Sequence, residues 1–451
     1  MEARTTASIF LSLTLFCAAL PAQQADYYQA PPPANASDAL AGGGFGQYIA
    51  AGPAYEPLCG GCPSICDSCE PWHLCPQCDG GLNFWGWMNA GFVGNTSSPD
   101  SKFNGPYNAI DRANELMLNQ MYFIGEKALP CDCCCGIGGR VDVIYGEDYF
   151  LAQSVGFENH DNGSPHWNSE YYGWAIPQAY VEMGRTDLSL KVGHFYSMVG
   201  YEGLPAYTQA RTPRAAGNFF YTKSYSYQFA GPFTHWGAVA TWKPSNYWET
   251  QFGLANGWDT LDREGQDNLN MLAYAKYSGD SGWWTSFGIV TGDDINNPGG
   301  LPITNAFTNR TRYSWIFSLP VGCNAQYVFH QWLGSQDQGA LDGGTAYWYG
   351  IDQYLYYNIN DCWKAGMRFE WFRDEDGTRV GLNRPSNPNK VPFVGNFYSV
   401  SAGLNWIPTS NFMMRPEIRA DWFGGDQARL PYNDGTEDYQ LLLGVDAILL
   451  F

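Results

Sequence analysis

Short and long connections alternate along residues 82–451, and this alternation restricts the fold more than any other feature of the sequence. Between the connections the chain divides into about sixteen segments of roughly 9–12 residues that read as β-strands. Short links lie near residues 184–187, 243–247, 278–282, 319–323, 360–362 and 408–411, and a longer one near 128–137. Long links lie near residues 94–114, 150–172, 199–232, 257–267, 292–311, 335–345, 374–395 and 424–436. Tight turns on one side and long loops on the other predict an all-β, antiparallel transmembrane barrel of about sixteen strands.

One strand-like segment does not fit this count. Residues 218–229 (NFFYTKSYSYQF) have the composition of a strand, but counting them as a spanning strand places every later long loop on the wrong side. We therefore assign the segment to the third long connection. The alternative is a seventeenth strand with strand boundaries that differ elsewhere.

The composition supports a membrane barrel and excludes other classes. Aromatic residues make up 16% of the chain and charged residues only 15%, against about 25% charged residues in a typical soluble domain. The mean hydropathy is nevertheless −0.31, and after the N-terminus no run of about 18 uncharged apolar residues occurs, which excludes a helical transporter. The net charge of −20 argues against nucleic acid as a partner.

Both ends of the chain carry export features. Residues 7–20 are apolar behind Arg4 and are followed by Leu20-Pro21-Ala22, which predicts a signal peptide over residues 1–22. Residues 23–58, rich in Pro and Gly, are predicted to form a flexible tether. The last segment alternates in steps of two and ends on Phe451, as in the C-terminal strand that outer-membrane proteins present to the barrel-assembly machinery. Its apolar face consists of Tyr439, Leu441, Leu443, Val445, Ala447, Leu449 and Phe451.

Alternation also separates a lipid face from an inner face. Residues 411–422 place apolar side chains on one side and four charges on the other. An Arg or Lys that faces hydrocarbon costs about 2–4 kcal/mol at mid-membrane, so the charges must face water inside the barrel. The candidate inner-face, pore-lining residues are Arg140, Asp142, Glu182, Lys191, Arg368, Glu370, Arg415, Glu417, Arg419 and Asp421. The alternative is that these charges pair with one another and seal the barrel.

Several short motifs occur in a fixed order along the barrel segment. They are Gly86-Trp87-Met88-Asn89-Ala90-Gly91, Leu118-Asn119-Gln120, Gly139-Arg140-Val141-Asp142-Val143-Ile144-Tyr145-Gly146, Gln178-Ala179-Tyr180, Gly193-His194-Phe195, Gly200-Tyr201-Glu202, Pro232-Phe233-Thr234-His235-Trp236-Gly237 and Asn256-Gly257-Trp258-Asp259. This order resembles the OmpL-like β-barrel porin family (porin-2 type) of the bacterial outer membrane, over residues 82–451.

The resemblance implies a channel, not an enzyme, in outer-membrane lipid, which passes ions and small hydrophilic solutes by diffusion. It also implies a third loop that folds into the barrel as a constriction, and by analogy a homotrimer. The candidate constriction residues are Glu202, Arg211, Arg214 and Lys223. The alternative function is a plugged structural or adhesive barrel linked to envelope partners through its N-terminal segment.

Twelve cysteines remain after removal of the signal peptide, and all are predicted to lie on the periplasmic side. Residues 59–80 form a Cys-rich segment with paired C-x2-C units. Such units bind zinc in cytosolic proteins, but the periplasm is oxidising, so we favour disulfides over zinc and expect no other cofactor. We expect this segment to be stapled beneath the barrel mouth. The cysteines are Cys59, Cys62, Cys66, Cys69, Cys75, Cys78, Cys131, Cys133, Cys134, Cys135, Cys323 and Cys362.

The outer loops carry clustered carboxylates, which predict a weak preference for cations. The clusters are Asp259/Asp262/Glu264/Asp267, Asp293/Asp294 and Asp374/Glu375/Asp376. Two motifs resemble parts of catalytic sites, but we interpret neither of them as one. Gly279-Asp280-Ser281-Gly282 matches a protease serine motif but reads as a tight turn. His160 and His166 lie in an outer loop, where histidines are usually solvated or stacked on aromatic rings.

Overall fold

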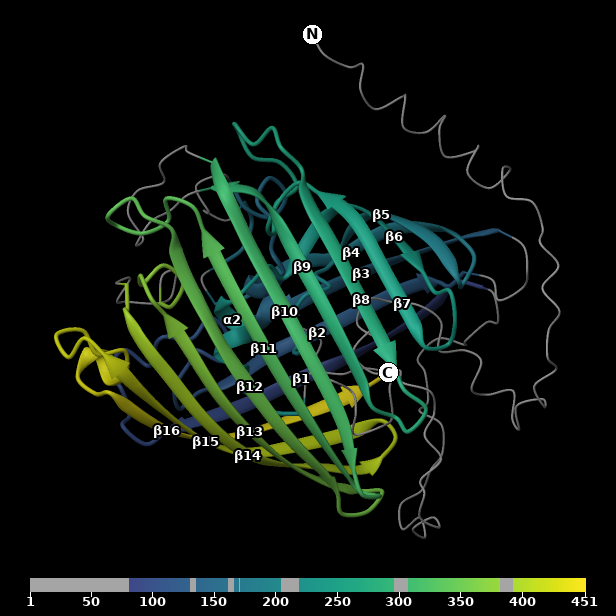
Figure 1. The fold of residues 1–451 in the computed structure, drawn as a ribbon. Helices are drawn as coiled ribbons and strands as arrows, with labels where there is room; N and C mark the ends of the chain where they lie inside the picture. Colours follow the sequence, from purple (N-terminus) through teal and green to yellow (C-terminus); the bar gives the residue numbers. More distant parts are fainter. Residues whose placement is uncertain are drawn as a thin grey trace.

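The computed structural model describes residues 81–451 apart from 130–134, 161–165, 170, 204–218, 296–306 and 382–391. It shows an antiparallel barrel in which each strand pairs with its neighbours in sequence and the last strand, β16, pairs with the first, β1 (Figure 1). The sixteen-stranded closed barrel predicted from the connections is therefore confirmed. In the described residues no helix is long and apolar enough to cross a membrane.

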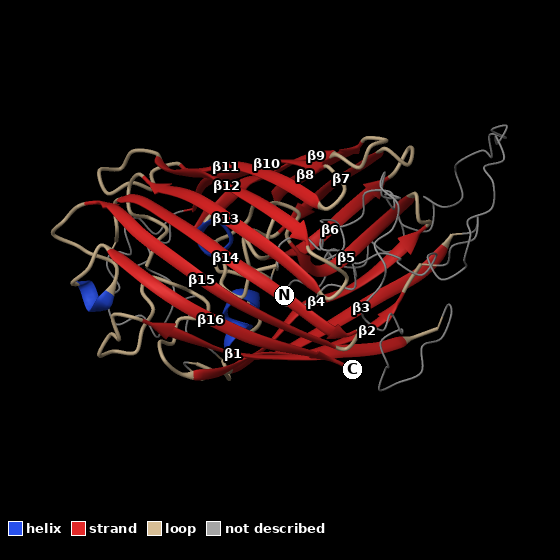
Figure 2. Cartoon of the chain, turned by 90° about the horizontal axis from the view of Figure 1, so that it is seen from below, coloured by secondary structure: helices blue, strands red, loops and turns tan. Residues whose placement is uncertain are grey.

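The strands run through the whole described chain. Their bounds are β1 Asn83–Asn95, β2 Leu116–Lys127, β3 Gly136–Gly146, β4 Gly173–Gly184, β5 Leu188–Tyr196, β6 Thr234–Trp242, β7 Trp248–Ala255 and β8 Asn270–Ser278. The second half comprises β9 Trp284–Ile295, β10 Phe307–Val321, β11 Ala325–Gln336, β12 Ala346–Asn358, β13 Trp363–Asp374, β14 Gly395–Thr409, β15 Phe412–Gly425 and β16 Tyr439–Leu450. Within the described residues, three short helices lie in the loops: η3 Glu147–Ala152, α2 Tyr225–Phe229 and η5 Asn433–Gly435 (Figure 2).

The connections follow the predicted alternation of short turns and long loops. Each predicted turn falls between two consecutive strands, for example residues 243–247 between β6 and β7. The largest offset is at the loop predicted over residues 292–311, which is limited to residues 296–306 because β9 continues to Ile295 and β10 begins at Phe307. Among the short turns, the one between β10 and β11 begins after Val321 rather than near residue 319. Residues 219–229 are not a strand: they lie in the third loop, residues 197–233, and include α2. The assignment of this segment to the third loop is confirmed.

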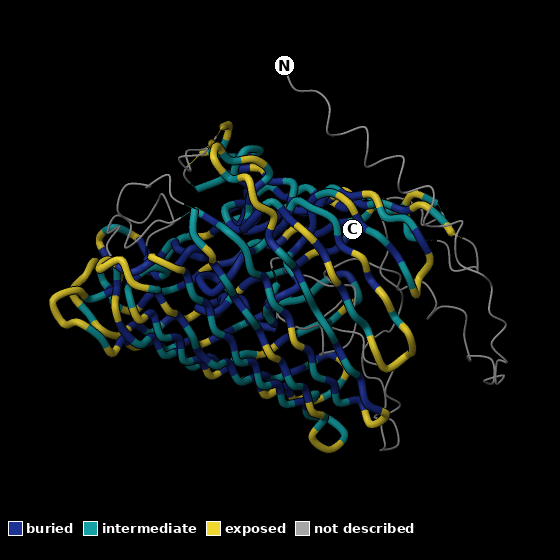
Figure 3. Tube along the Cα trace, turned by 45° about the horizontal axis from the view of Figure 1, so that its top comes forward, coloured by how far each residue is buried: buried dark blue, intermediate teal, exposed yellow. Residues whose placement is uncertain are grey.

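The two faces of each strand differ as the alternation predicts. On β16, Tyr439, Leu443, Val445 and Leu449 are exposed on the outside, while Gln440 is buried on the inside, as is Asp446. The burial pattern repeats around the barrel (Figure 3). Phe451 lies at the seam, where it exchanges two backbone hydrogen bonds of 2.9 and 3.0 Å with Gly86. The residue predicted as the assembly signal therefore follows the strand that closes the barrel.

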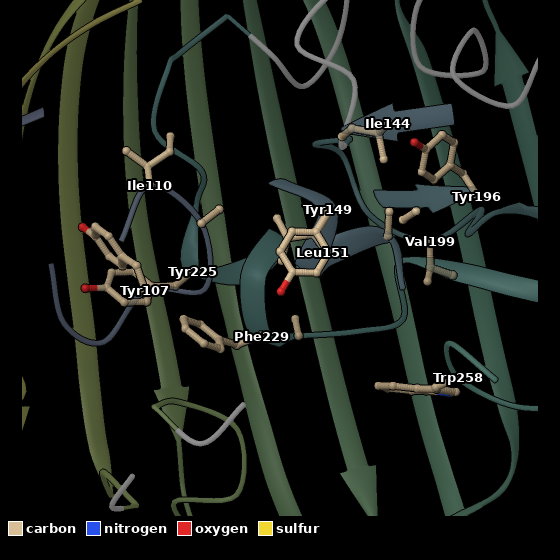
Figure 4. Close-up of a cluster of buried hydrophobic side chains, with 14 of the residues drawn as sticks. Tyr107, Ile110, Ile144, Tyr149, Leu151, Tyr196, Val199, Tyr225, Phe229 and Trp258 are labelled. Carbon is tan, nitrogen blue, oxygen red and sulfur yellow. The ribbon is translucent and has the colours of Figure 1, made fainter. Parts of the chain in front are cut away.

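The barrel interior contains a hydrophobic core built largely by the loops. Tyr107 of the first loop, Tyr149 and Leu151 of the second, and Tyr225 and Phe229 of the third are all buried. Their side chains lie inside the barrel in one cluster (Figure 4). The cluster continues onto the wall through inward-facing aromatic residues of β11–β15: Trp332, Trp348, Phe372, Phe397 and Phe423.

Candidate channel interior and the third loop

The third loop crosses the barrel interior and reaches the opposite wall. Near its start, Glu202 accepts a hydrogen bond of 2.9 Å from Arg368 Nη1 on β13 and one of 3.1 Å from the Tyr354 hydroxyl on β12. The Tyr201 ring packs on the Tyr354 ring with centroids 4.6 Å apart. Arg368, Glu202 and Tyr201 are all at most 9% exposed, so this ion pair is shielded from bulk solvent.

A row of inward-facing glycines on the wall receives the returning part of the loop. Gly366 of β13 pairs with Gly403 of β14, which pairs with Glu417 of β15, which pairs with Gly444 of β16. A Cβ added at Gly366 would lie 2.4 Å from the Phe219 ring. This row, Gly366–Gly403–Gly444, is called the glycine row below.

The next two loop residues lie over the same row. A Cβ at Gly403 would be 3.4 Å from the Phe220 ring, and one at Gly444 would be 3.2 Å from the Tyr221 ring. Since glycine in a strand interior weakens the strand, its repeated use here indicates that another chain segment approaches closely. The wall is shaped to hold Phe219, Phe220 and Tyr221.

Polar contacts fix the loop beside the glycine row. Glu417 accepts hydrogen bonds from the Thr222 backbone N–H at 2.8 Å and from its hydroxyl at 2.6 Å. Arg368 Nη1 donates to the Thr222 carbonyl at 2.9 Å, and Arg419 Nη1 donates to the Lys223 carbonyl at 2.6 Å. Hydrogen bonds to charged groups in a buried setting are about twice as strong as neutral ones. Three predicted wall residues therefore anchor the loop.

Helix α2 continues this attachment. The Ser224 side chain caps it by accepting from the Tyr227 N–H, the expected role of serine at a helix start. Ser226 donates through its N–H to Glu370 at 2.7 Å and through its hydroxyl to Asp352 at 2.7 Å. Glu370, predicted as an inner-face residue, therefore also holds the third loop.

Asp352 belongs to a chain of hydrogen bonds with Ser314 and His330. Ser314 Oγ lies 2.9 Å from His330 Nε2, and His330 Nδ1 lies 2.7 Å from Asp352 Oδ2. The order matches that of a hydrolase triad. All three residues are at most 2% exposed, so a substrate has no access to Ser314 in this arrangement. We interpret the chain as a structural link between the wall and Ser226.

The first and second loops join the third. Gln228 Oε1 accepts from the N–H groups of Asn108 and Ala109 of the first loop at 2.7 and 3.2 Å. Glu147 of the second loop accepts from the Ile110 N–H at 3.2 Å. The Tyr107 hydroxyl donates to Asp421 of β15. The first loop is therefore held inside the barrel by the third loop, the second loop and the wall.

The predicted inner-face residues all occur at inward positions, most of them in ion pairs. Arg140 pairs with Asp142 at 2.6 Å, and Arg419 with Asp421 at 2.8 Å. Arg415 donates from Nε to Asp446 at 2.9 Å. Glu182 accepts a hydrogen bond from Ser189 at 2.6 Å and pairs in register with Lys191, whose amino group lies 4.1 Å from the Tyr180 ring centre.

The residues predicted for the constriction are only partly described. Lys223 donates a hydrogen bond to the Gly203 carbonyl at 3.1 Å, whereas Arg211 and Arg214 lie outside the described residues.

Several carboxylates predicted to lie in outer loops are engaged inside the protein, and two of them, Asp294 and Asp374, lie within strands β9 and β13. Asp294 pairs with Arg263 at 3.2 Å and Arg310 at 3.3 Å. Asp374 accepts from three backbone N–H groups of the seventh loop. Asp259 accepts from the N–H groups of Phe233 and Thr234, and burial raises its pKa to about 7. The field of the acidic rim is therefore weaker than the sequence suggests.

His160 and His166 and the cysteines lie apart from this interior. His166 Nε2 lies 3.0 Å from His160 Nδ1 at an exposed position. Cys135, Cys323 and Cys362 lie at the turn end of the barrel, whereas Cys59–Cys78, Cys131, Cys133 and Cys134 fall outside the described residues, as do the predicted signal peptide and tether. Within the described part of the chain, no group of three or more His, Cys, Asp or Glu side chains is placed to hold a metal ion.

The family model "Putative beta-barrel porin-2, OmpL-like" matches residues 81–451, which cover all of the barrel. The chain belongs to this family. The resemblance seen in the ordered motifs is therefore confirmed, and with it a barrel of the bacterial outer membrane. No curated protein matches the chain.

Solved outer-membrane structures share the fold of this OmpL-like porin. The channel DcaP of Acinetobacter baumannii superposes with a TM-score of 0.54 at 11% identity, covering 82% of this chain and 97% of DcaP. An anion-selective porin from Comamonas acidovorans gives a TM-score of 0.51 at 10% identity, covering 82% of this chain and 99% of that porin. At these identities the likeness shows the barrel fold.

Two features of the interior were not predicted from the sequence. The glycine row was missed, although parity places Gly366 on the same face as Arg368, and Gly444 on the same face as Asp446. Inward glycines on neighbouring strands were the available signal, because glycine is disfavoured in strands unless something packs against it. The inward folding of the first loop was also missed. It depends on long-range contacts such as that of Gln228 with Asn108, which no local pattern reveals.

Proposed function

We propose that this OmpL-like porin passes ions and small hydrophilic solutes across the outer membrane by passive diffusion. We propose further that the third loop forms its constriction. The observation that carries this proposal is the attachment of the loop to the inner wall over the glycine row and through Thr222, Glu417 and Arg368. A loop fixed across the lumen reduces the cross-section open to solutes.

Polar side chains mark the part of the interior along which we propose that solutes pass. Toward the turn end, the inward positions carry Lys191, Gln251, Lys276, Ser286 and Ser318, each at most 5% exposed. Side chains of this kind line hydrated pores, so the proposed path requires that water reach them. The apolar cluster of the loops includes the aromatic wall of β11–β15, and it also reaches inward residues of β1–β9 such as Tyr122, Leu272 and Val290. We infer that solutes pass along the remaining, polar part of the interior.

The first loop narrows the same path. Because Tyr107 and Asn108 are held against Asp421 and Gln228, they occupy volume within the barrel that an exposed outer loop would leave open. We therefore expect a conductance well below that of a barrel of equal strand number whose first loop extends outward.

The second candidate function is a plugged barrel that links envelope components. The loop core inside the barrel favours it, because buried aromatic side chains from three loops are typical of a folded plug. Cys323 and Cys362 lie in two turns at the same end of the barrel, between β10 and β11 and between β12 and β13. We propose that disulfides at this end staple the Cys-rich N-terminal segment beneath the barrel mouth. Assembly as a homotrimer stays a prediction, which the native mass of the detergent-solubilised protein would test.

Single-channel recording in a planar bilayer separates the two functions. Native or refolded protein is added under a salt gradient after circular dichroism has confirmed the β-barrel. Stable conductance steps support the channel. Silence from a demonstrably folded barrel refutes it and supports the plugged barrel.

A further inference from the structure

Arginines on the inner face of the strands have carboxylate partners, with one exception. Arg140 pairs with Asp142, Arg310 with Asp294, Arg368 with Glu202, Arg415 with Asp446 and Arg419 with Asp421. Arg312 of β10 lies two positions from Arg310 on the same face and is only 3% exposed. Among the described residues, no carboxylate lies within ion-pairing distance of its guanidinium. Arg312 is therefore a buried cation with no carboxylate in direct contact with its guanidinium.

The surroundings of Arg312 leave its donors unused. Its Nη1 makes one long hydrogen bond of 3.5 Å to the Val199 carbonyl, and its Nε–H has no partner. The guanidinium lies against the backbone at both ends of the third loop. A Cβ added at Gly231 would be 2.1 Å from Nη1, and one at Gly200 would be 3.4 Å from Nη2. Two glycines thus leave space for this side chain between the wall and the loop.

A second unused donor lies on the adjacent strand. The indole N–H of Trp332 is buried and has no partner. Trp332 is paired with Ser314, which is two positions from Arg312, so both unused donors belong to one inner-face patch of β10 and β11. The nearby carboxylate of Asp352 is already bonded to His330 and Ser226. The patch therefore has more N–H donors than acceptors in direct contact with them.

Burial of an unpaired charge is costly. Truncation of one partner in a buried ion pair typically costs about 3–5 kcal/mol, because the remaining charge is uncompensated. A buried guanidinium is retained when something of opposite charge compensates it. A small anion satisfies both the charge and the free N–H groups.

We propose that Arg312 is an anion-binding residue of the channel interior, which takes chloride or a solute carboxylate between the wall and the third loop. The proposal rests on the proposed channel function and adds a class of ligand to it. It predicts that anions are favoured at this position, against the weak cation preference that the acidic outer loops alone suggested.

Binding can be tested without conduction. Chloride-35 NMR line broadening by the folded, detergent-solubilised protein reports exchangeable bound chloride. The wild-type protein should broaden the chloride line, and added formate should reduce this broadening by competing for the site. Arg312→Gln should lose most of the broadening that the wild type produces. Arg310→Gln is the matched control, since it removes the same charge from the same face of β10 but takes it from a paired arginine. Equal broadening by the wild type and Arg312→Gln overturns the proposal.

Selectivity is tested by the reversal potential in a potassium chloride gradient. Arg312→Gln should lower the chloride-to-potassium permeability ratio by about twofold or more, the size expected for loss of a unit charge near the ion path. Arg310→Gln should change the permeability ratio less than Arg312→Gln does. Arg312→Lys, which retains the charge, should keep the ratio close to that of the wild type. Equal shifts in the two glutamine variants overturn the proposal. A folded wild type that broadens the chloride line but does not conduct refutes the channel function and leaves the anion site standing.

Discussion

Replacement of Gly366 by alanine should release the third loop from the wall while leaving the barrel intact. The added Cβ would lie 2.4 Å from Phe219 Cε1 and 2.7 Å from its Cδ1. Phe219 is 4% exposed and is confined by Phe220 and Tyr356, with ring centroids 5.0 and 5.1 Å away, so its ring cannot turn aside freely. The strand itself should tolerate alanine, which is about 0.5–1 kcal/mol better than glycine in a regular element.

The size of the effect follows from the burial of Phe219. A fully buried phenylalanine side chain contributes about 1.5–3 kcal/mol relative to an exposed one. Since about 1.4 kcal/mol is a factor of ten, loss of this contact should raise the undocked-to-docked ratio of the loop by about 10- to 150-fold. The anchors at Thr222 and Glu202 remain, so the loop should exchange between docked and undocked states.

Single-channel recording measures this exchange. Gly366→Ala should show larger or flickering conductance steps than the wild type, with unchanged heat resistance of the barrel on gels. Gly424→Ala is the control, because its Cβ would have only ordinary contacts, at 3.7 Å from the Tyr398 ring. In a Phe219→Ala background, Gly366→Ala should have no further effect, as a double-mutant cycle requires. Wild-type conductance in Gly366→Ala, or an undiminished effect without Phe219, would refute the docking argument.

Three further predictions follow from other contacts. Glu202→Gln removes the charge that pairs with Arg368 at 2.9 Å, and Arg368 also anchors Thr222. The variant should therefore unfold at a lower temperature and show more current noise than the wild type. Equal unfolding temperatures and equal noise in the two proteins would contradict this. Burial raises the pKa values of Glu158 and Asp259 to about 7, so their contribution to loop stability is fully present below about pH 4 and is lost as the pH rises through 7. Hydrogen exchange of Val155 and Leu261, whose N–H groups link the second and fourth loops, should therefore be faster relative to the intrinsic rate at pH 8.5 than at pH 5.5. Peptide mapping without reductant should find Cys323 and Cys362 joined to other cysteines; a full set of free or metal-bound thiols would rule out the stapled segment.

The barrel could be predicted because a membrane imposes rules that are local in sequence. Every backbone polar group must be paired within the bilayer, so strands must be regular and the sheet must close. Connections then alternate between two sides, and this parity excluded residues 218–229 as a strand although their composition favoured one. The same regularity placed Arg368, Arg415 and Arg419 on the inner face.

The interior could be predicted only in part. Parity shows that a side chain points inward but not what it meets there. Glu417 read as a pore-lining charge, yet both of its carboxylate oxygens bind Thr222 of the third loop. Asp294 read as an exposed rim carboxylate but is buried between two arginines. These pairings join residues that are far apart in the chain, and no local spacing encodes them.

The inward aromatic residues of β11–β15 follow from the folded loops. In a water-filled barrel, an inward Phe372 or Phe397 would expose a large apolar surface, which alternation alone would count as an exception. Here both rings pack against Tyr225 of α2, with centroids 6.4 and 5.2 Å away. The glycine row and this aromatic wall are two halves of one adaptation: the first makes room for the loop and the second supplies an apolar surface for it. Apolar or glycine residues at inward positions therefore mark where loops dock, whereas inward charged residues divide between those that anchor a loop, such as Glu417, and those that pair within the wall, such as Arg140 with Asp142.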